Sequence, residues 1–193
     1  MKKLLLIFGF VAVFSIQESA AQKWAIKSNL LYDATASINL GFETALAKKW
    51  TFDMSGDWNS FQFSDNKKWK HWFLQPEVRY WTCRRFGGHF FAGHLWTGQY
   101  NVGNVDFIPD FLGTPFSSLK DSRYEGWFVG AGLGYGYAWM LGKHWNLEAE
   151  LCVGVAYTEF DKFQCMKCGD NLGNGDHLYF GPTKAAINLV YLF

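Results

Sequence analysis

The chain contains 193 residues, of which 20% are aromatic and 18% are charged. Its 18 basic and 17 acidic side chains leave a formal net charge of +1, so the chain has no strongly basic character and we expect no nucleic-acid partner. The length suits a single domain, and an aromatic-rich composition without a long internal apolar run is more typical of a membrane β-barrel than of a water-soluble sandwich.

The first 21 residues have the features of a secretory signal peptide. Lys2 and Lys3 precede the apolar stretch "LLLIFGFVAVF", and the small residues Ser19 and Ala21 precede the expected cleavage point. The apolar stretch is too short for a transmembrane helix, which needs about 20 residues. The pattern therefore predicts an exported protein, with a signal peptide at residues 1–21 and a mature domain at residues 22–193.

Apolar and polar residues then alternate along the chain, as residues 50–60 illustrate. In "WTFDMSGDWNS", Trp50, Met54 and Trp58 share one parity, whereas Asp53 and Asp57 share the other. Successive side chains of a β-strand point to opposite faces, so this segment predicts a strand with one apolar and one polar face. Residues 125–140 and 145–158 repeat the pattern.

Eight such runs predict eight strands, at residues 23–32, 37–46, 50–60, 70–82, 89–100, 125–140, 145–158 and 178–193. After a short connection at 33–36, short turns at 47–49, 83–88 and 141–144 alternate with longer loops at 61–69, 101–124 and 159–177. Short periplasmic turns and longer surface loops are the normal arrangement of bacterial outer-membrane barrels.

The length of these runs and the position of their aromatic residues favour a membrane-spanning fold. Several runs reach the length of about 10 residues that a tilted transmembrane strand needs. Their apolar faces carry aromatic residues at both ends, where two membrane–water interfaces would lie. The sequence thus predicts an all-β, eight-stranded antiparallel up-and-down transmembrane β-barrel in the lipid of the outer membrane. A soluble sandwich, whose strands also alternate, is the alternative.

The inward parity of such a barrel carries polar and charged residues. Buried charges are normally paired, so we expect mutual pairing within the interior, with a functional network as the alternative. A barrel of eight strands has room for side chains or one small ligand, so a packed interior is favoured over a narrow channel. The glycines between residues 130 and 136 suggest a local groove as a further alternative. The charged residues of this predicted network are Lys27, Glu43, Asp53, Glu77, Arg79, Glu148, Glu150 and Lys184.

The last segment, "YFGPTKAAINLVYLF", alternates to its final residue. Its outward parity is expected to contain Thr183, Ala185, Ile187, Leu189, Tyr191 and Phe193. A terminal aromatic on such a strand resembles the signal by which the outer-membrane assembly machinery recognises its substrates. We therefore predict that Tyr191 and Phe193 form an assembly signal, and that this strand pairs with the first because an open edge in lipid is costly.

Few residues are candidates for catalysis, metal binding or disulfide formation. Cys165 and Cys168 form a CxxC pair, for which a loop disulfide is favoured in an exported protein, with free thiols or a metal pair as alternatives. His94 is the best-placed histidine for lipid-modifying chemistry, but no G-x-S-x-G or comparable nucleophile motif accompanies it. A lone histidine on a strand is more often a hydrogen-bonding residue. We therefore predict no catalytic residue, no metal site and no cofactor.

The longest predicted loop, residues 101–124, is unusually apolar. We expect it to fold over the barrel mouth, or alternatively to present a surface for a partner protein. The candidates for such an interaction are Phe107, Ile108, Phe111, Leu112 and Phe116.

Segments spread over nearly the whole mature chain resemble the DUF3575 family of Bacteroidetes proteins. They are "KSNLLYDATASINLGFE", "RYW", "GYGYAW" with the following "LGKHWNLEAELCVGVAYTEFDKF", and "YFGPTKAAINLVYLF". The resemblance implies a small outer-membrane barrel of unknown function, in some members associated with genes for surface fimbriae. It brings no catalytic motif, and "CMKCGDN" has no counterpart in the family pattern.

We expect a non-enzymatic protein with a structural, adhesive or assembly-accessory role at the cell surface, with fimbrial or other surface proteins as partners. A lipid-modifying enzyme of the same architecture is the alternative.

Overall fold

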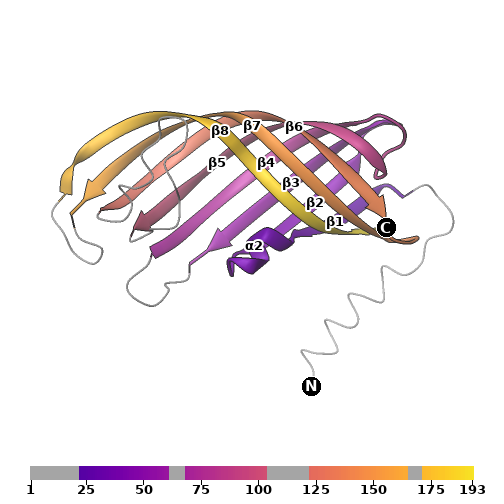
Figure 1. Ribbon diagram of the computed structural model, residues 1–193, viewed down its shortest axis with the longest axis horizontal. Helices are drawn as coiled ribbons and strands as arrows, with labels where there is room; N and C mark the ends of the chain where they lie inside the picture. The colour runs from indigo at the N-terminus through magenta and orange to yellow at the C-terminus, as the bar shows by residue number, and fades with distance from the viewer. Residues whose placement is uncertain (1–21, 61–67, 104–121, 165–170) are drawn as a thin grey trace, which may run out of the picture.

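The computed structural model describes residues 22–60, 68–103, 122–164 and 171–193, so the predicted signal peptide lies outside the described residues. The described part forms eight strands and one short helix, α2 (Leu30–Ala34) (Figure 1). The strands are β1 (Trp24–Asn29), β2 (Ile38–Ala45), β3 (Trp50–Asn59), β4 (Lys68–Trp81), β5 (Gly88–Gly103), β6 (Arg123–Met140), β7 (Trp145–Phe163) and β8 (Asn171–Leu192).

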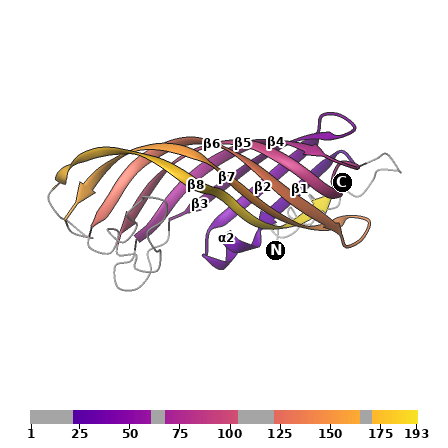
Figure 2. The same ribbon diagram turned by 45° about the horizontal axis from the view of Figure 1, so that its top comes forward.

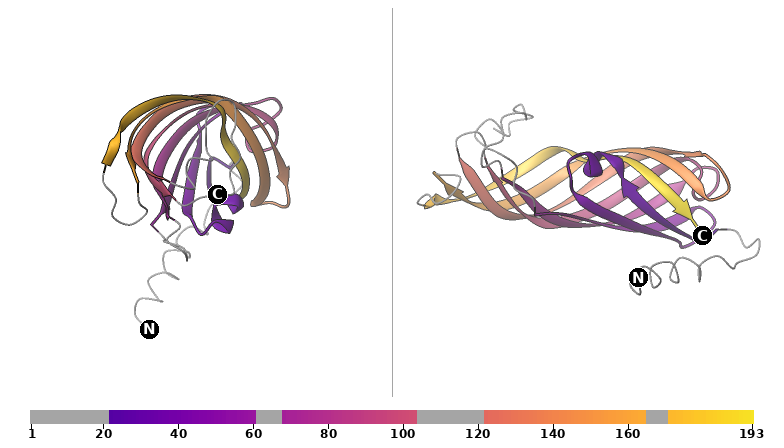
Figure 3. Two further views of the ribbon diagram at one scale, coloured as in Figure 1. Left: turned by 60° about the vertical axis from the view of Figure 1, so that its left-hand side comes forward. Right: turned by 90° about the horizontal axis from the view of Figure 1, so that it is seen from below.

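Every strand pairs antiparallel with the next along the chain, and β8 pairs back with β1, so the sheet closes into a ring. Figure 3 shows the strands wrapping around a common interior. The predicted all-β class, the eight strands and their up-and-down antiparallel order are confirmed. Among the described residues, no helix has the length and apolar character needed to cross a bilayer.

The strands lengthen along the chain, from 6 residues in β1 to 22 in β8. β8 pairs with β1 only over residues 188–192, so residues 171–187 continue past the end of β1. Figures 1 and 2 show β5 to β8 extending beyond the shorter strands. The sequence analysis ends β5 and β7 too early, at residues 100 and 158, and begins β8 too late, at residue 178. Main-chain pairing continues there although the outward face is no longer uniformly apolar.

The first predicted strand, residues 23–32, is also wrong at its end. The strand stops at Asn29, whose side chain accepts a hydrogen bond from the backbone N–H of Leu31 and caps helix α2. Leu30 and Leu31 are consecutive apolar residues, and both are exposed on this helix. The pair breaks the two-residue period that a strand with one buried face requires.

Thr183 was expected to point outward, but it is 7% exposed and lies inside the ring. The pairing of β7 with β8 shifts by one residue between Cys152↔Lys184 and Val153↔Pro182. This β-bulge places both Thr183 and Lys184 in the interior, because an extra residue on one strand breaks the strict alternation of faces.

The end of the ring with the short turns is filled by an apolar cluster. Trp81 and Phe90 are fully buried with ring centroids 4.7 Å apart, and Phe86 packs against Trp81 at 6.2 Å. Phe86 comes from the turn between β4 and β5, where its φ of 61° is unusual for an aromatic residue. Its carbonyl accepts a 2.5 Å hydrogen bond from Asn146 Nδ2, which holds this turn inward.

Candidate functional site

The interior above the apolar cluster contains a network of charged side chains. All eight residues of the predicted network come together there, each at most 7% exposed. They derive from β1, β2, β3, β4, β7 and β8, so the network connects strands that are far apart around the ring. We call this set, Lys27, Glu43, Asp53, Glu77, Arg79, Glu148, Glu150 and Lys184, the interior charge network.

Arg79 of β4 occupies the centre of this network. Its Nε donates to Glu77 Oε1 at 2.5 Å, and its Nη2 donates to Glu150 Oε2 at 2.7 Å. Its Nη1 donates to Glu43 Oε2 and to Glu148 Oε2, both at 3.0 Å. The guanidinium also lies 4.5 Å from the ring centroid of Phe90. Charge-assisted bonds of this kind are the strongest protein hydrogen bonds, so one side chain ties β4 to β2 and β7.

Two lysines complete the network on either side of Arg79. Lys27 Nζ contacts the carboxylates of Glu43 and Asp53 and lies 3.5 Å from Glu148 Oε2. Lys184 Nζ lies 2.7 Å from Glu77 Oε2 and 3.0 Å from Glu150 Oε2. The network therefore joins three cationic side chains to five carboxylates, and its formal charge is −2.

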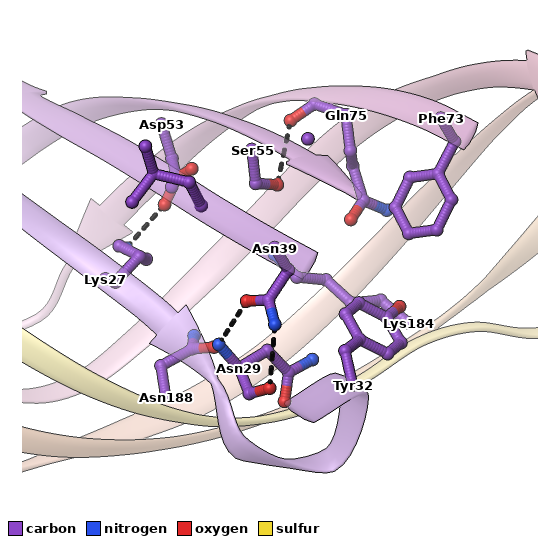
Figure 4. Close-up of a pocket in the computed structure, with 13 residues that line it drawn as sticks. Lys27, Asn29, Tyr32, Asn39, Asp53, Ser55, Phe73, Gln75, Lys184 and Asn188 are labelled. Atoms are coloured by element: carbon purple, nitrogen blue, oxygen red, sulfur yellow. Dashed lines mark hydrogen bonds and ion pairs between the residues drawn. The ribbon is translucent and has the colours of Figure 1, made fainter. Parts of the chain in front are cut away.

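A small cavity borders the network on the side of helix α2 (Figure 4). Its volume is about 20 Å³, which is enough for about one water molecule. Asn29, Asn39, Tyr32 and Phe73 line it, and the Asn39 side chain bonds to both the N–H and the carbonyl of Asn29. The interior thus leaves little free space at this level.

Glycines of β6 allow a second group of polar residues to pack beside the network. A Cβ on Gly132 would lie 2.6 Å from His94 Cε1, and one on Gly134 would lie 2.1 Å from Cys152 Sγ. Similar contacts with Trp96 and Phe90 would arise at Gly130 and Gly136. The groove that the glycine run suggested is therefore filled by side chains of neighbouring strands.

His94 is 3% exposed and Cys152 is 1% exposed. Together with Glu77 they place one possible ligand atom each, a nitrogen, a sulfur and an oxygen, within 4.8 Å of one another. Sequence reasoning considered His94 but overlooked Cys152 and Thr183 as its neighbours. The inward parity of residues 146–158 could have identified Cys152, whereas the bulge concealed Thr183.

The remaining predicted site residues fall into two groups. Cys165, Cys168 and the loop residues Phe107, Ile108, Phe111, Leu112 and Phe116 lie outside the described residues, so those hypotheses stay predictions. Tyr191 and Phe193 lie at the short-turn end, with ring centroids 4.9 Å apart. The backbone N–H of Phe193 donates to the Trp24 carbonyl, so the last residue continues the pairing with the first strand.

Comparison with known proteins identifies the family of this chain. The sequence model of a protein family, described as "Protein of unknown function (DUF3575)", matches residues 5–193. The chain belongs to the DUF3575 family. No curated protein and no solved structure is detectably similar to it. Membership in DUF3575 does not indicate an activity.

Proposed function

We propose that this DUF3575 protein is an integral outer-membrane β-barrel with a structural, non-enzymatic role at the cell surface. The observation that carries the proposal is the polarity of the ring: charged residues fill its interior, while large apolar residues cover its exterior. Leu133, Leu40 and Leu95 are 73%, 63% and 61% exposed, whereas Glu43 and Arg79 are fully buried. A water-soluble protein rarely exposes such a continuous apolar surface, and hydrocarbon would cover it at no cost.

Aromatic residues at both ends of the outer face support a membrane placement. Trp50, Trp139 and Trp145 lie near the short turns, and Trp58 and Trp127 lie toward the opposite end, all of them exposed. Trp127 and Trp139 are 12 residues apart on β6. This spacing corresponds to about 40 Å along the strand and to about 28 Å across a bilayer at a tilt of about 45°. The two levels match the interfaces of a hydrocarbon core about 30 Å thick.

The packed interior favours a structural role over transport. Trp81, Phe86 and Phe90 fill the short-turn end, and the charge network fills the level above it. The cavity of about 20 Å³ beside the network is too small for a permeating solute. Lipid modification is also disfavoured as a role, because His94 is 3% exposed and faces the interior rather than the lipid.

The length of β5 to β8 supports a role at the surface. β6, β7 and β8 contain 18, 19 and 22 residues, about twice the length that a membrane-spanning strand needs. Their outer parts would stand above the lipid, at the end of the ring opposite the short turns. The candidate residues for binding a fimbrial or other surface protein, Phe107, Ile108, Phe111, Leu112 and Phe116, belong to the connection between β5 and β6 and lie outside the described residues. The family resemblance, rather than any described residue, is what suggests the fimbrial link.

Fractionation and conductance measurements test the two parts of the proposal. We expect the protein to sediment with the outer membrane, to require detergent for extraction and to change its electrophoretic mobility on heating. Recovery from the periplasm without detergent would overturn the membrane assignment. In planar bilayers we expect no ion conductance, since the interior is packed. A steady conductance at low protein density would overturn the structural role and favour a channel.

A further inference from the structure

Glu77 of β4, His94 of β5 and Cys152 of β7 converge at one point of the interior. Glu77 and His94 are directly paired across β4 and β5, and His94 Nδ1 lies 3.9 Å from Glu77 Oε2. Cys152 comes from the far side of β6, and it reaches this point because β6 carries Gly132 and Gly134 between His94 and Cys152. A side chain at Gly132 would collide with His94 and Thr183, and a side chain at Gly134 would collide with Cys152.

His94 and Thr183 have polar atoms without partners at this point, whereas the Cys152 thiol donates to Glu150 Oε1 at 3.3 Å. Neither ring nitrogen of His94 forms a hydrogen bond with the described residues, although the side chain is buried. The Thr183 hydroxyl, which would lie 2.5 Å from a Cβ on Gly132, also has no hydrogen bond within the described part of the chain. Buried polar groups are nearly always satisfied, and an exception indicates a bound water or ion. Three neighbouring orphan atoms therefore point to a ligand.

The charge of the surroundings indicates the sign of that ligand. The interior charge network has a formal charge of −2, and an uncompensated charge is costly in a closed interior. A divalent cation would reduce the imbalance. Of the network carboxylates, Glu77 lies closest to His94. Lys184 bonds Glu77 Oε2 in the structure. If a cation took that oxygen, Lys184 would keep Glu150 as a partner at 3.0 Å.

We propose that Glu77, His94 and Cys152 form a buried site for one divalent transition-metal ion of the zinc type. A set of one imidazole nitrogen, one thiolate and one carboxylate oxygen suits zinc rather than magnesium or calcium, which prefer oxygen ligands. On binding, the metal–sulfur bond replaces the S–H bond of Cys152, and the thiol proton leaves to solvent. The ion would join β4, β5 and β7, and it would need to enter before the ring closes because the site is buried.

Cobalt(II) is a suitable probe, because its thiolate complexes absorb light strongly. The chain has four cysteines, so the substitutions Cys83→Ser, Cys165→Ser and Cys168→Ser leave Cys152 as the only thiol. This chain is refolded in detergent with cobalt(II) and freed of excess metal by gel filtration. We expect one cobalt ion per folded chain and a sulfur-to-cobalt charge-transfer band, both of which zinc(II) should displace.

The ligand residues are then tested in the same background. Cys152→Ala should abolish the charge-transfer band, and His94→Gln should reduce the retained cobalt at least tenfold. His89→Gln is the matched control, because His89 is an exposed histidine of the same strand, and it should leave both signals unchanged. If Cys152→Ala does not fold, the comparison of His94→Gln with His89→Gln decides the question.

Two results would overturn the proposal. One is a folded Cys152-only chain that retains no cobalt, in which case protons on the carboxyl groups balance the network. The other is cobalt retention that His94→Gln leaves unchanged, which would show an adventitious site. Because the readout is metal bound to folded chain in detergent, it does not depend on where in the cell the barrel resides.

Discussion

The inner and outer faces of strand β7 differ by a single residue step yet have opposite chemistry. Glu150 is 5% exposed and bonded to Arg79 and Lys184, whereas its neighbour Leu151 is 59% exposed on the outside of the ring. On β3, Asp53 at 1% and Met54 at 41% repeat the contrast. The inner face is held by directional charge pairs between strands, whereas the outer face depends on the medium that covers it. Substitutions on the two faces should therefore fail for different reasons.

The largest effect is expected on the inner face, at Arg79. Arg79→Met would leave Glu43, Glu77, Glu148 and Glu150 without their shared partner. Breaking one buried pair costs about 3–5 kcal/mol, and here several break together, so we expect little folded protein. Unfolding by guanidinium in detergent, followed by tryptophan fluorescence, measures the loss.

The control for this substitution is Arg123→Met, which removes the same side chain from an ion pair with the half-exposed Glu125. A surface pair of this kind is worth at most about 1 kcal/mol. Arg79→Lys should recover only part of the stability, because an ammonium cannot reproduce the guanidinium fork. Equal stabilities of Arg79→Met and Arg123→Met would show that the interior network does not hold the strands together.

An intermediate effect is expected on the outer face, at Leu133. In water, arginine at a position that is 73% exposed would be harmless. Near the middle of a bilayer it should cost about 2–4 kcal/mol. Leu172→Arg provides the matched control, since Leu172 is 53% exposed but lies at the start of β8, beyond the proposed lipid level. Refolding equilibria in lipid vesicles should separate the two variants, and equal stabilities would contradict the membrane placement.

The smallest effect on stability is expected at Phe193, which is 36% exposed on the outer face. Phe193→Ala should cost at most about 1.5–3 kcal/mol, the value for full burial of a phenylalanine. If the residue is an assembly signal, the amount inserted in cells should fall sharply while the inserted fraction unfolds nearly as wild type does. Phe91→Ala, at another exposed phenylalanine, should leave insertion intact. Equal insertion of both variants would reduce Phe193 to a packing residue.

Residue patterns alone were sufficient for the strand count and for the faces of most strands. Asp53, Glu148 and Arg79 could be assigned to the interior because each lies on the polar parity of a long alternating run. The alternation of short and long connections gave the up-and-down order, since short turns join antiparallel neighbours. The alternation of side chains and the lengths of the connections are local features of the sequence. A strand with one apolar and one charged face can bury its charges only when the charged face points into the ring.

Other features depended on contacts between distant strands. Helix α2 and the bulge at Thr183 interrupt the alternation, and their positions depend on Asn29, on the register of β7 with β8, and on the space inside the ring. The glycines of β6 looked like an open groove in sequence, but they accommodate His94 and Cys152 from the two flanking strands. The sequence by itself determined which side chains face inward wherever the alternation is unbroken, because that is a property of each strand. Only the tertiary structure decided which of them meet, because closure of the ring brings together residues that are far apart in the chain. Lys27 and Glu148 are 121 positions apart, and Glu77 and Lys184 are 107 positions apart.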